Sequence, residues 1–362
     1  MKKTIIILLL AGVGLSWAVH AAGILTEGVN SIKFDRRATG KQSWQKIYAV
    51  NVINPNIPYS VKTGGIMQKL KQDFAGSNVE LLAILHCGKA EAEKFASCHP
   101  EFDFAMSYDE DLAGLRKLLQ NSGDSFNQAS IFNYSGKLLW SGDPVDLPLL
   151  LKLITTQKYN ERDEIRIGVH YSELQTALRS GSAKLIGQAA DKILELRSEQ
   201  LSAVNAKAYS LEMIGDHRQL EAFFRSRIKR FPDAPENYIM LIEAALRNPP
   251  ITAIIPEIAQ EFIKNCPDDS ENINALAWSL LNNLPFNTQA LETAGKAVGL
   301  LQKSAIADQS NVLATRALLA YRKCDLALAL ELITKAQAGA VSNSEKAFLQ
   351  EMKNYFEHLS KK

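Results

Sequence analysis

The chain has 362 residues, 46% of them hydrophobic, and its 41 Lys and Arg residues nearly balance its 39 Asp and Glu residues. This apolar content is ample for a packed core, which excludes a disordered chain. A formal charge of only +2, with no basic stripe, argues against a nucleic-acid-binding protein.

The first 21 residues are typical of an export signal. Two lysines follow Met1, an apolar run extends from Ile5 to Val19, and cleavage is expected after Ala21. The run is shorter than the roughly 20 residues that a membrane-spanning helix needs, and no later run is long enough. We therefore expect an exported protein without an integral membrane segment in the mature chain. The periplasm is the first expectation, and outer-membrane association and secretion remain open alternatives.

Residues 28–157 alternate between strand and helix patterns and are expected to form one domain. In chain order the patterns predict strands over 47–53 and 79–85, helices over 64–74, 90–97 and 112–119, a hairpin with strands over 129–133 and 137–140, and a helix over 147–154. Gly136 supplies the positive φ that the hairpin turn needs. This order predicts a mixed central sheet with helices on both faces, an α/β domain.

Three stretches of this domain resemble the thioredoxin-like fold, in particular its exported redoxin branch. Residues 130–142, with the sequence SIFNYSGKLLWSG, are similar to the late hairpin of that branch, while 79–104 and 48–74 fit its middle and first portions. The resemblance places Ile57-Pro58-Tyr59-Ser60 where a redoxin has Cys-x-x-Cys, and Asn127 where it has a cis-proline. Redoxin chemistry needs a low-pKa thiolate and a second, resolving thiol. The resemblance therefore implies a redoxin scaffold without redoxin chemistry.

The four cysteines are Cys87, Cys98, Cys266 and Cys324. Cys87 and Cys98 flank the helix expected over 90–97, which would span about 12 Å, whereas the Cα atoms of a disulfide lie within about 7 Å. We expect four free thiols or at most one disulfide. His86 would lower the pKa of the Cys87 thiol if the two side chains met, but neighbouring residues on a strand point to opposite faces. No metal or cofactor motif is present, and none is expected to bind.

Beyond a charged segment expected to be a linker over 158–169, residues 170–362 show the pattern of helical hairpins. Residues 231–237 are echoed 35 positions later by 266–272, from Pro232 to Pro267. Helices are expected over 171–178 and 183–196, 202–213 and 217–230, within 236–264, 271–301 and 311–336, and after a capping box at 342–345. The period, with the residues 275–278 and 314–321, resembles tetratricopeptide (TPR) repeats. The last helix is expected to cap the stack.

Together these patterns predict an exported, non-catalytic protein-binding adaptor. Its repeats are expected to hold a protein or peptide partner, and the degenerate redoxin groove around Tyr59, Ser60 and Asn127 is a second candidate surface. Two alternatives remain open. In the first, the protein is a thiol-disulfide oxidoreductase or peroxidase that works through Cys87 or Cys98. In the second, its first domain is only a folded spacer.

Overall fold

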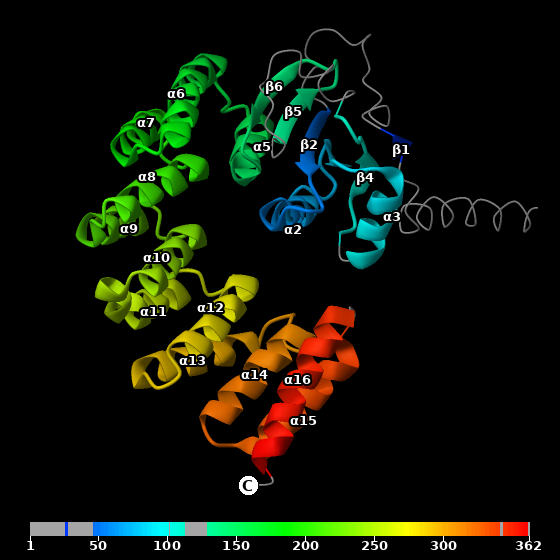
Figure 1. Ribbon diagram of the computed structural model, residues 1–362, viewed down its shortest axis with the longest axis vertical. Helices are drawn as coiled ribbons and strands as arrows, with labels where there is room; N and C mark the ends of the chain where they lie inside the picture. The colour runs from blue at the N-terminus through cyan, green and yellow to red at the C-terminus, as the bar shows by residue number, and fades with distance from the viewer. Residues whose placement is uncertain (1–25, 28–45, 101, 113–128, 341–342, 361–362) are drawn as a thin grey trace, which may run out of the picture. The chain divides into compact units, whose positions relative to one another are not determined.

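The computed structural model describes residues 26–27, 46–100, 102–112, 129–340 and 343–360 (Figure 1). The chain divides into two compact units, 1–207 and 208–362, and each is described by itself. The expected signal peptide with its cleavage after Ala21, the helix expected over 112–119 beyond its first residue, and Asn127 lie outside the described residues.

The first unit is built on a mixed sheet. Its strands are β1 (Thr26–Glu27), β2 (Ile47–Ile53), β3 (Val79–Leu85), β4 (Ala105–Tyr108), β5 (Ala129–Asn133) and β6 (Leu138–Gly142). Their spatial order is β1-β4-β3-β2-β5-β6. β2 pairs in parallel with β3 and antiparallel with β5, and β5 pairs antiparallel with β6. The predicted mixed sheet is confirmed, and β1 and β4, which were not predicted, add two parallel strands at one edge.

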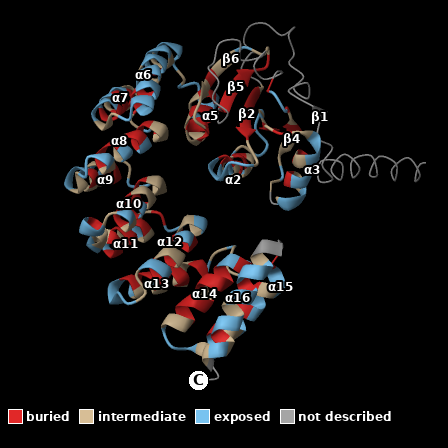
Figure 2. Cartoon of the chain, in the orientation of Figure 1, coloured by how far each residue is buried: buried red, intermediate tan, exposed pale blue. Residues whose placement is uncertain are grey.

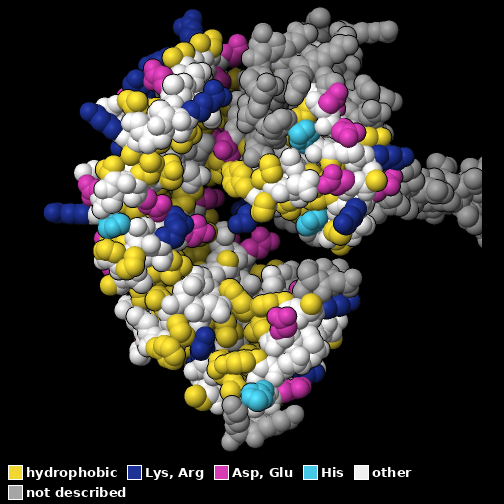
Figure 3. Space-filling model, viewed as in Figure 1, with side chains coloured by type: hydrophobic (Ala, Val, Ile, Leu, Met, Phe, Trp, Pro, Cys, Tyr) yellow, Lys and Arg dark blue, Asp and Glu magenta, His cyan; other side chains and the backbone are white. Residues whose placement is uncertain are grey.

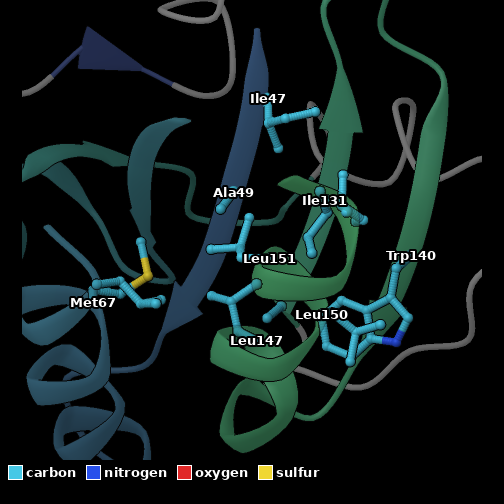
Figure 4. Packing of buried hydrophobic residues seen from close by; sticks show 11 residues of the cluster. Ile47, Ala49, Met67, Ile131, Trp140, Leu147, Leu150 and Leu151 are labelled. Carbon is cyan, nitrogen blue, oxygen red and sulfur yellow. The ribbon is translucent and has the colours of Figure 1, made fainter. Parts of the chain in front are cut away.

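A hydrophobic core fills the space between one face of this sheet and two helices, α2 (Pro58–Asp73) and α5 (Leu147–Thr155) (Figure 4). Every residue of β2 is buried, as expected for a strand at the centre of a sheet. Helix α3 (Lys89–Cys98) packs its buried residues Ala92 and Phe95 into a separate cluster with the ends of β2 and β3. Between β6 and α5 lies the short 3-10 helix η3 (Pro144–Asp146).

Two boundaries in this domain differ from the predictions. Helix α2 begins at Pro58, not at Gly64, because extended Ile57 is followed by a proline, whose fixed φ suits the first helical position. Strand β6 continues two residues beyond the predicted end at Trp140. The hairpin turn is confirmed, with Gly136 at a φ of 83°.

The helical part begins earlier than the sequence patterns indicate. Helix α6 (Glu161–Ser180) occupies most of the segment 158–169 that was expected to be a linker. The Asn160 side chain caps this helix by accepting a hydrogen bond from the backbone N–H of Arg162. Three acidic residues in the first turn add favourable interactions with the helix dipole, which explains why such a charged segment is helical. Helix α7 (Ala183–Leu196) completes the first hairpin, and α8 (Leu201–Met213) follows.

The second unit continues the hairpins. Its helices are α9 (His217–Arg230), α10 (Pro235–Arg247), η4 (Pro249–Ile254), α11 (Ile255–Asn265), α12 (Ser270–Asn283), α13 (Thr288–Leu301), α14 (Ser310–Arg322), α15 (Leu326–Gly339) and α16 (Asn343–Ser360). Asp216, Asp269, Asn287 and Asp325 cap four of them with side-chain oxygens. Figure 2 shows buried residues along the faces where the helices pack, most continuously on α14. The predicted helical hairpins are thus present, and the helix η4 interrupts the third of them.

Among the described residues, none of the helices combines the length and the apolar character that crossing a membrane requires.

Candidate functional site

The segment that resembles a redoxin active site lies at the N-terminus of α2, and most of its polar groups are satisfied internally. Ser60 is fully buried, and its Oγ accepts a hydrogen bond of 2.7 Å from the backbone N–H of Asn54. The Thr63 hydroxyl donates to the Ser60 carbonyl at 2.6 Å and accepts from the Asn51 amide at 2.8 Å. Ser60 is therefore a structural residue that a ligand at the surface does not reach.

Ile57 and Tyr59 are the residues of this segment with exposed apolar side chains, at 37% and 48% exposure. The Tyr59 hydroxyl donates to the Asp143 carboxylate at 3.2 Å. Burial, and then the negative charge of Asp143, raise the pKa of the Tyr59 phenol. The segment therefore presents an apolar edge and no group that is prepared to act as a nucleophile or base.

The cysteine near this segment is not activated. Cys87 is only 6% exposed, and burial, together with the carboxylates of Glu91 and Glu110, raises the pKa of its thiol to about 11. Such a thiol is almost entirely protonated near neutral pH, whereas the thiolate is the reactive form. His86 interacts through its Nδ1 with the Asn54 amide at 3.4 Å.

The other three cysteines lie elsewhere in the chain, away from the segment at the start of α2. Cys98 is exposed at the end of α3, and the ring of His99, next to it, contacts the rings of Phe95 and Phe102, which also contact each other. Cys266 is buried and Cys324 exposed, and all four thiols are free. Within the described ranges, no cluster of three or more His, Cys, Asp and Glu residues has the arrangement of a metal site.

A buried carboxylate joins the α/β domain to the first helices of the same unit. Asp146, in η3, is fully buried, and its two oxygens accept hydrogen bonds from the Tyr171 hydroxyl at 2.7 Å and the Ser202 backbone N–H at 3.0 Å. Burial raises the pKa of this carboxyl, while its hydrogen bonds oppose the shift. We call these three residues the Asp146 junction. Its role is to hold structure together, since a fully buried group has no access to a substrate.

The second unit contains a different kind of surface. Two cavities of about 310 and 340 Å³ adjoin each other, and Trp278 of α12 and Phe348 of α16 line both. We call the pair the aromatic groove. Figure 3 shows hydrophobic side chains gathered on the visible face over α12, α14 and α16.

The first of these cavities is rich in tyrosine, and we call it the tyrosine cavity. Its lining residues are Trp278, Asn282, Leu318, Tyr321, Arg322, Phe348, Met352, Tyr355 and Phe356. The hydroxyls of Tyr321 and Tyr355 are 3.0 Å apart and share a hydrogen bond. Tyr355 is 52% exposed and Phe348 is 45% exposed.

The second carries two carboxylates, and we call it the acidic cavity. Its lining residues are Glu271, Asn274, Ala275, Trp278, Asn311, Ala314, Thr315, Glu345, Phe348 and Leu349. Asn274 is 8% exposed, and its side-chain oxygen has no hydrogen-bond partner among the described residues. An unpaired buried acceptor costs about 1–3 kcal/mol, but this oxygen is itself buried, so a ligand in the cavity does not reach it.

The groove residues of α14 and α16 are related by a spacing in the sequence that differs from the 35-residue repeat between Pro232 and Pro267. Six groove residues of α14 are matched in α16 at an offset of 34 positions: Asn311 by Glu345, Ala314 by Phe348, Thr315 by Leu349, Leu318 by Met352, Tyr321 by Tyr355 and Arg322 by Phe356. Helix α16 thus repeats the groove-facing pattern of α14. Leu349 and Phe356 contribute to the cavity walls and also pack into the core, where each is 1% exposed. The expected capping helix therefore covers the last hairpin and also lines the groove.

A third cavity, of about 520 Å³, lies at the C-terminal end of α2, where Phe74, Val79 and Phe104 contribute to its wall. None of the residues singled out from the sequence lines it. Pro58 and its neighbours lie at the opposite end of α2.

Comparison with known proteins adds no relative to these observations. No family model matches the chain, and a search of curated proteins finds no match.

Proposed function

We propose that this protein is an exported, non-catalytic adaptor that binds a segment of a partner protein in the aromatic groove. In this proposal residues 28–157 form a thioredoxin-like domain that lacks the Cys-x-x-Cys motif, and residues 170–362 form TPR-like repeats. The observation that carries the proposal is the pair of adjoining cavities between α12, α14 and α16, lined by exposed aromatic side chains.

Aromatic side chains that are exposed together favour protein binding. Trp, Tyr and Phe are enriched at interfaces because they bring a large contact area at a small cost in conformational entropy. Trp278 and Phe348 meet edge to face, with ring centroids 5.8 Å apart, and Tyr321 and Tyr355 meet similarly at 5.7 Å. The groove is therefore formed by rings that hold one another in place, and a bound segment has little ordering left to do.

The enzymatic alternative receives no support from the cysteines near the degenerate motif. The burial and raised pKa of Cys87 oppose a role as nucleophile, and Ser60 is buried where a redoxin has its second cysteine. The exposed edge formed by Ile57 and Tyr59 remains the candidate for a second protein contact in the first domain.

The test is site-specific photocrosslinking with the full chain in the cells that export it. A photoreactive amino acid replaces Phe348 in the groove or, as the matched control, Leu328 on α15, which is 41% exposed and lines neither cavity. We expect a discrete protein adduct from position 348 that is absent from position 328. The adduct should weaken in a Tyr355→Ser background, because Tyr355 lines the same groove. Identical adducts at both positions, or no adduct at position 348, would contradict the proposal.

A further inference from the structure

The tyrosine cavity contains a cation and no anion. Arg322, at the end of α14, is the one charged side chain among the described residues that line it. Within the part of the chain that the structure describes, its guanidinium forms no ion pair. The positive charge at this cavity is therefore not neutralised by a carboxylate of the protein.

The guanidinium is held in one position by two neighbours. Its Nε donates a hydrogen bond of 3.1 Å to the Leu281 carbonyl of α12, and its central carbon lies 5.4 Å from the centroid of the Tyr321 ring. Arginine has five N–H donors, and those on the two Nη atoms of Arg322 have no partner among the described residues. A guanidinium fixed in this way offers a preorganised pair of donors to the two oxygens of a carboxylate.

The end of α14 does not need this side chain as a cap. A cation near a helix C-terminus often serves the last carbonyls of its own helix. Here the carbonyls of Leu319, Ala320 and Tyr321 all accept hydrogen bonds from backbone N–H groups in the turn that follows. Arg322 instead reaches across to α12, so capping of α14 does not account for its place in the groove.

The paired tyrosines add a second donor. Their two hydroxyls have two protons, and only one proton is used in the hydrogen bond between Tyr321 and Tyr355. That hydrogen bond, and then burial, raise the pKa of Tyr321, which keeps its hydroxyl protonated near neutral pH. A cation and a spare phenolic proton favour the same kind of ligand group, an anionic acceptor beside an apolar body that covers the rings.

We propose that the tyrosine cavity binds the carboxylate of an Asp or Glu side chain in the partner segment, through the Nη groups of Arg322. This inference rests on the proposed function, since it specifies the chemistry that the groove selects. The carboxylate belongs to a side chain and not to the end of a chain, because a segment that continues on both sides buries more of the half-exposed rings of Phe348 and Tyr355.

The experiment selects binders of the full chain from a phage-displayed library of short random peptides. The peptides are displayed at the N-terminus of a coat protein, so an acidic group can come only from a side chain. We expect enrichment of Asp or Glu next to apolar or aromatic residues. The most enriched peptide is then synthesised with an amidated C-terminus, and exchange of its acid for the matching amide should weaken binding about tenfold at low salt, as for loss of a charge-assisted contact.

Protein variants then locate the effect. Arg322→Gln should remove the preference for the acid over the amide, and Arg322→Lys should keep part of it, because the charge remains while the planar pair of donors is lost. Arg218→Gln is the matched control, since Arg218 is exposed on α9 and lines neither cavity, and this variant should keep the full preference. Circular dichroism melting checks that the three variants are folded.

The outcomes distinguish this inference from the proposed function. A selection without enriched acids, equal binding of the acid and amide peptides, or a preference that Arg322→Gln leaves intact would overturn the carboxylate site. Recovery of the amide peptide's binding by a free C-terminal carboxylate would assign the site to a chain end and overturn the side-chain assignment. If the crosslink at position 348 persists in any of these cases, protein binding in the groove stands without the carboxylate. If that crosslink is absent as well, the proposed function fails.

Discussion

The N-terminal end of α2 and the aromatic groove are the two candidate surfaces of this protein. They differ in how much of their polar and apolar side-chain surface is already covered by neighbouring residues. At α2, Ser60 and Thr63 are buried and hydrogen-bonded, and the Cys87 thiol is held in its protonated form. In the groove, Phe348 and Tyr355 are about half exposed. A surface that leaves apolar area exposed gains free energy when a partner covers it.

The comparison teaches that buried, internally bonded groups and exposed aromatic side chains belong to different parts of this chain. In the proposed function the α/β domain is a scaffold without a reactive pair, and the helical hairpins present the binding surface. The following experiments test that division, in order of decreasing expected effect.

Removing the carboxylate of the Asp146 junction should have the largest effect. Asp146→Ala leaves the Tyr171 hydroxyl and the Ser202 N–H without their acceptor in a fully buried place. We expect the free energy of unfolding of the first unit to fall by roughly 2–6 kcal/mol, the cost of two unsatisfied buried donors, measured by urea denaturation of the full chain. The exposed Asp103→Ala is the control, and an Asp146→Ala protein with unchanged stability would show that the junction does not hold the unit together.

Thiol labelling should separate the buried cysteines from the exposed ones. At pH 8 a thiol with a pKa of about 11, as for Cys87 and Cys266, has a thiolate fraction about 100-fold below that of an ordinary thiol. We expect maleimide to modify Cys98 and Cys324 first, and mass spectrometry of timed samples to follow the order. Rapid modification of Cys87, together with peroxide consumption that Cys87→Ser abolishes, would restore the enzymatic alternative.

The Asp146 junction should also make stability depend on pH. The pKa of the carboxyl is raised in the folded state, so between the unfolded value near 4 and the folded value the native protein binds more protons than the unfolded chain. The free energy of unfolding should therefore fall as pH rises through that window, by at most about 1.4 kcal/mol per pH unit for one group. Asp146→Asn is neutral throughout and should lack this slope.

Denaturation series from pH 4 to 7 compare the two proteins. Burial, and to a smaller extent the charge of Asp146, raise the pKa of Asp143, so Asp146→Asn also lowers the Asp143 pKa and the difference between the profiles reports both carboxyls. Parallel pH profiles would mean that Asp146 titrates alike in the folded and unfolded chain, which the buried geometry does not allow.

The smallest effects should come from single hydroxyls at the two surfaces. Tyr59→Phe removes an exposed hydrogen bond to Asp143, and Tyr355→Phe removes the one to Tyr321. Each should cost less than about 1 kcal/mol of stability, because water replaces the lost partner. Tyr355→Phe should also keep the crosslink at position 348, since the ring remains. Loss of that crosslink would mean that the groove recognises its partner through the hydroxyl and not through the ring.

Local signals predicted several elements to the residue. Helices α7 and α9 begin and end where the patterns indicated, because Ser182 and Asp216 cap them and these signals are contained in the neighbouring residues. Strands β2 and β5 were found for the same reason, since each is a short run of buried residues between turns. The start of α2 was misplaced because the two glycines at 64 and 65 were taken as the break, whereas Pro58 determines it.

The candidate sites were harder to predict than the elements. Asp146 meets residues 25 and 56 positions away, and no periodicity relates them. The groove could have been predicted in part, because the 34-residue offset between Tyr321 and Tyr355 can be seen in the sequence once α16 is compared with α14. That offset was hidden because α12 and α14 are separated by 40 positions, so the strict period fails between them.

The sequence by itself determined the order of the elements, strands and helices first and helical hairpins after them, since strand and helix periods, caps and turn residues depend on neighbours along the chain. It also showed that no cysteine stands between Met1 and Leu85. Only the tertiary structure decided that Ser60 and Cys87 are buried, that Asp146 joins two parts of the first unit, and that α12, α14 and α16 share one groove. Burial and the pairing of distant side chains arise from packing between elements, and no local pattern contains that information.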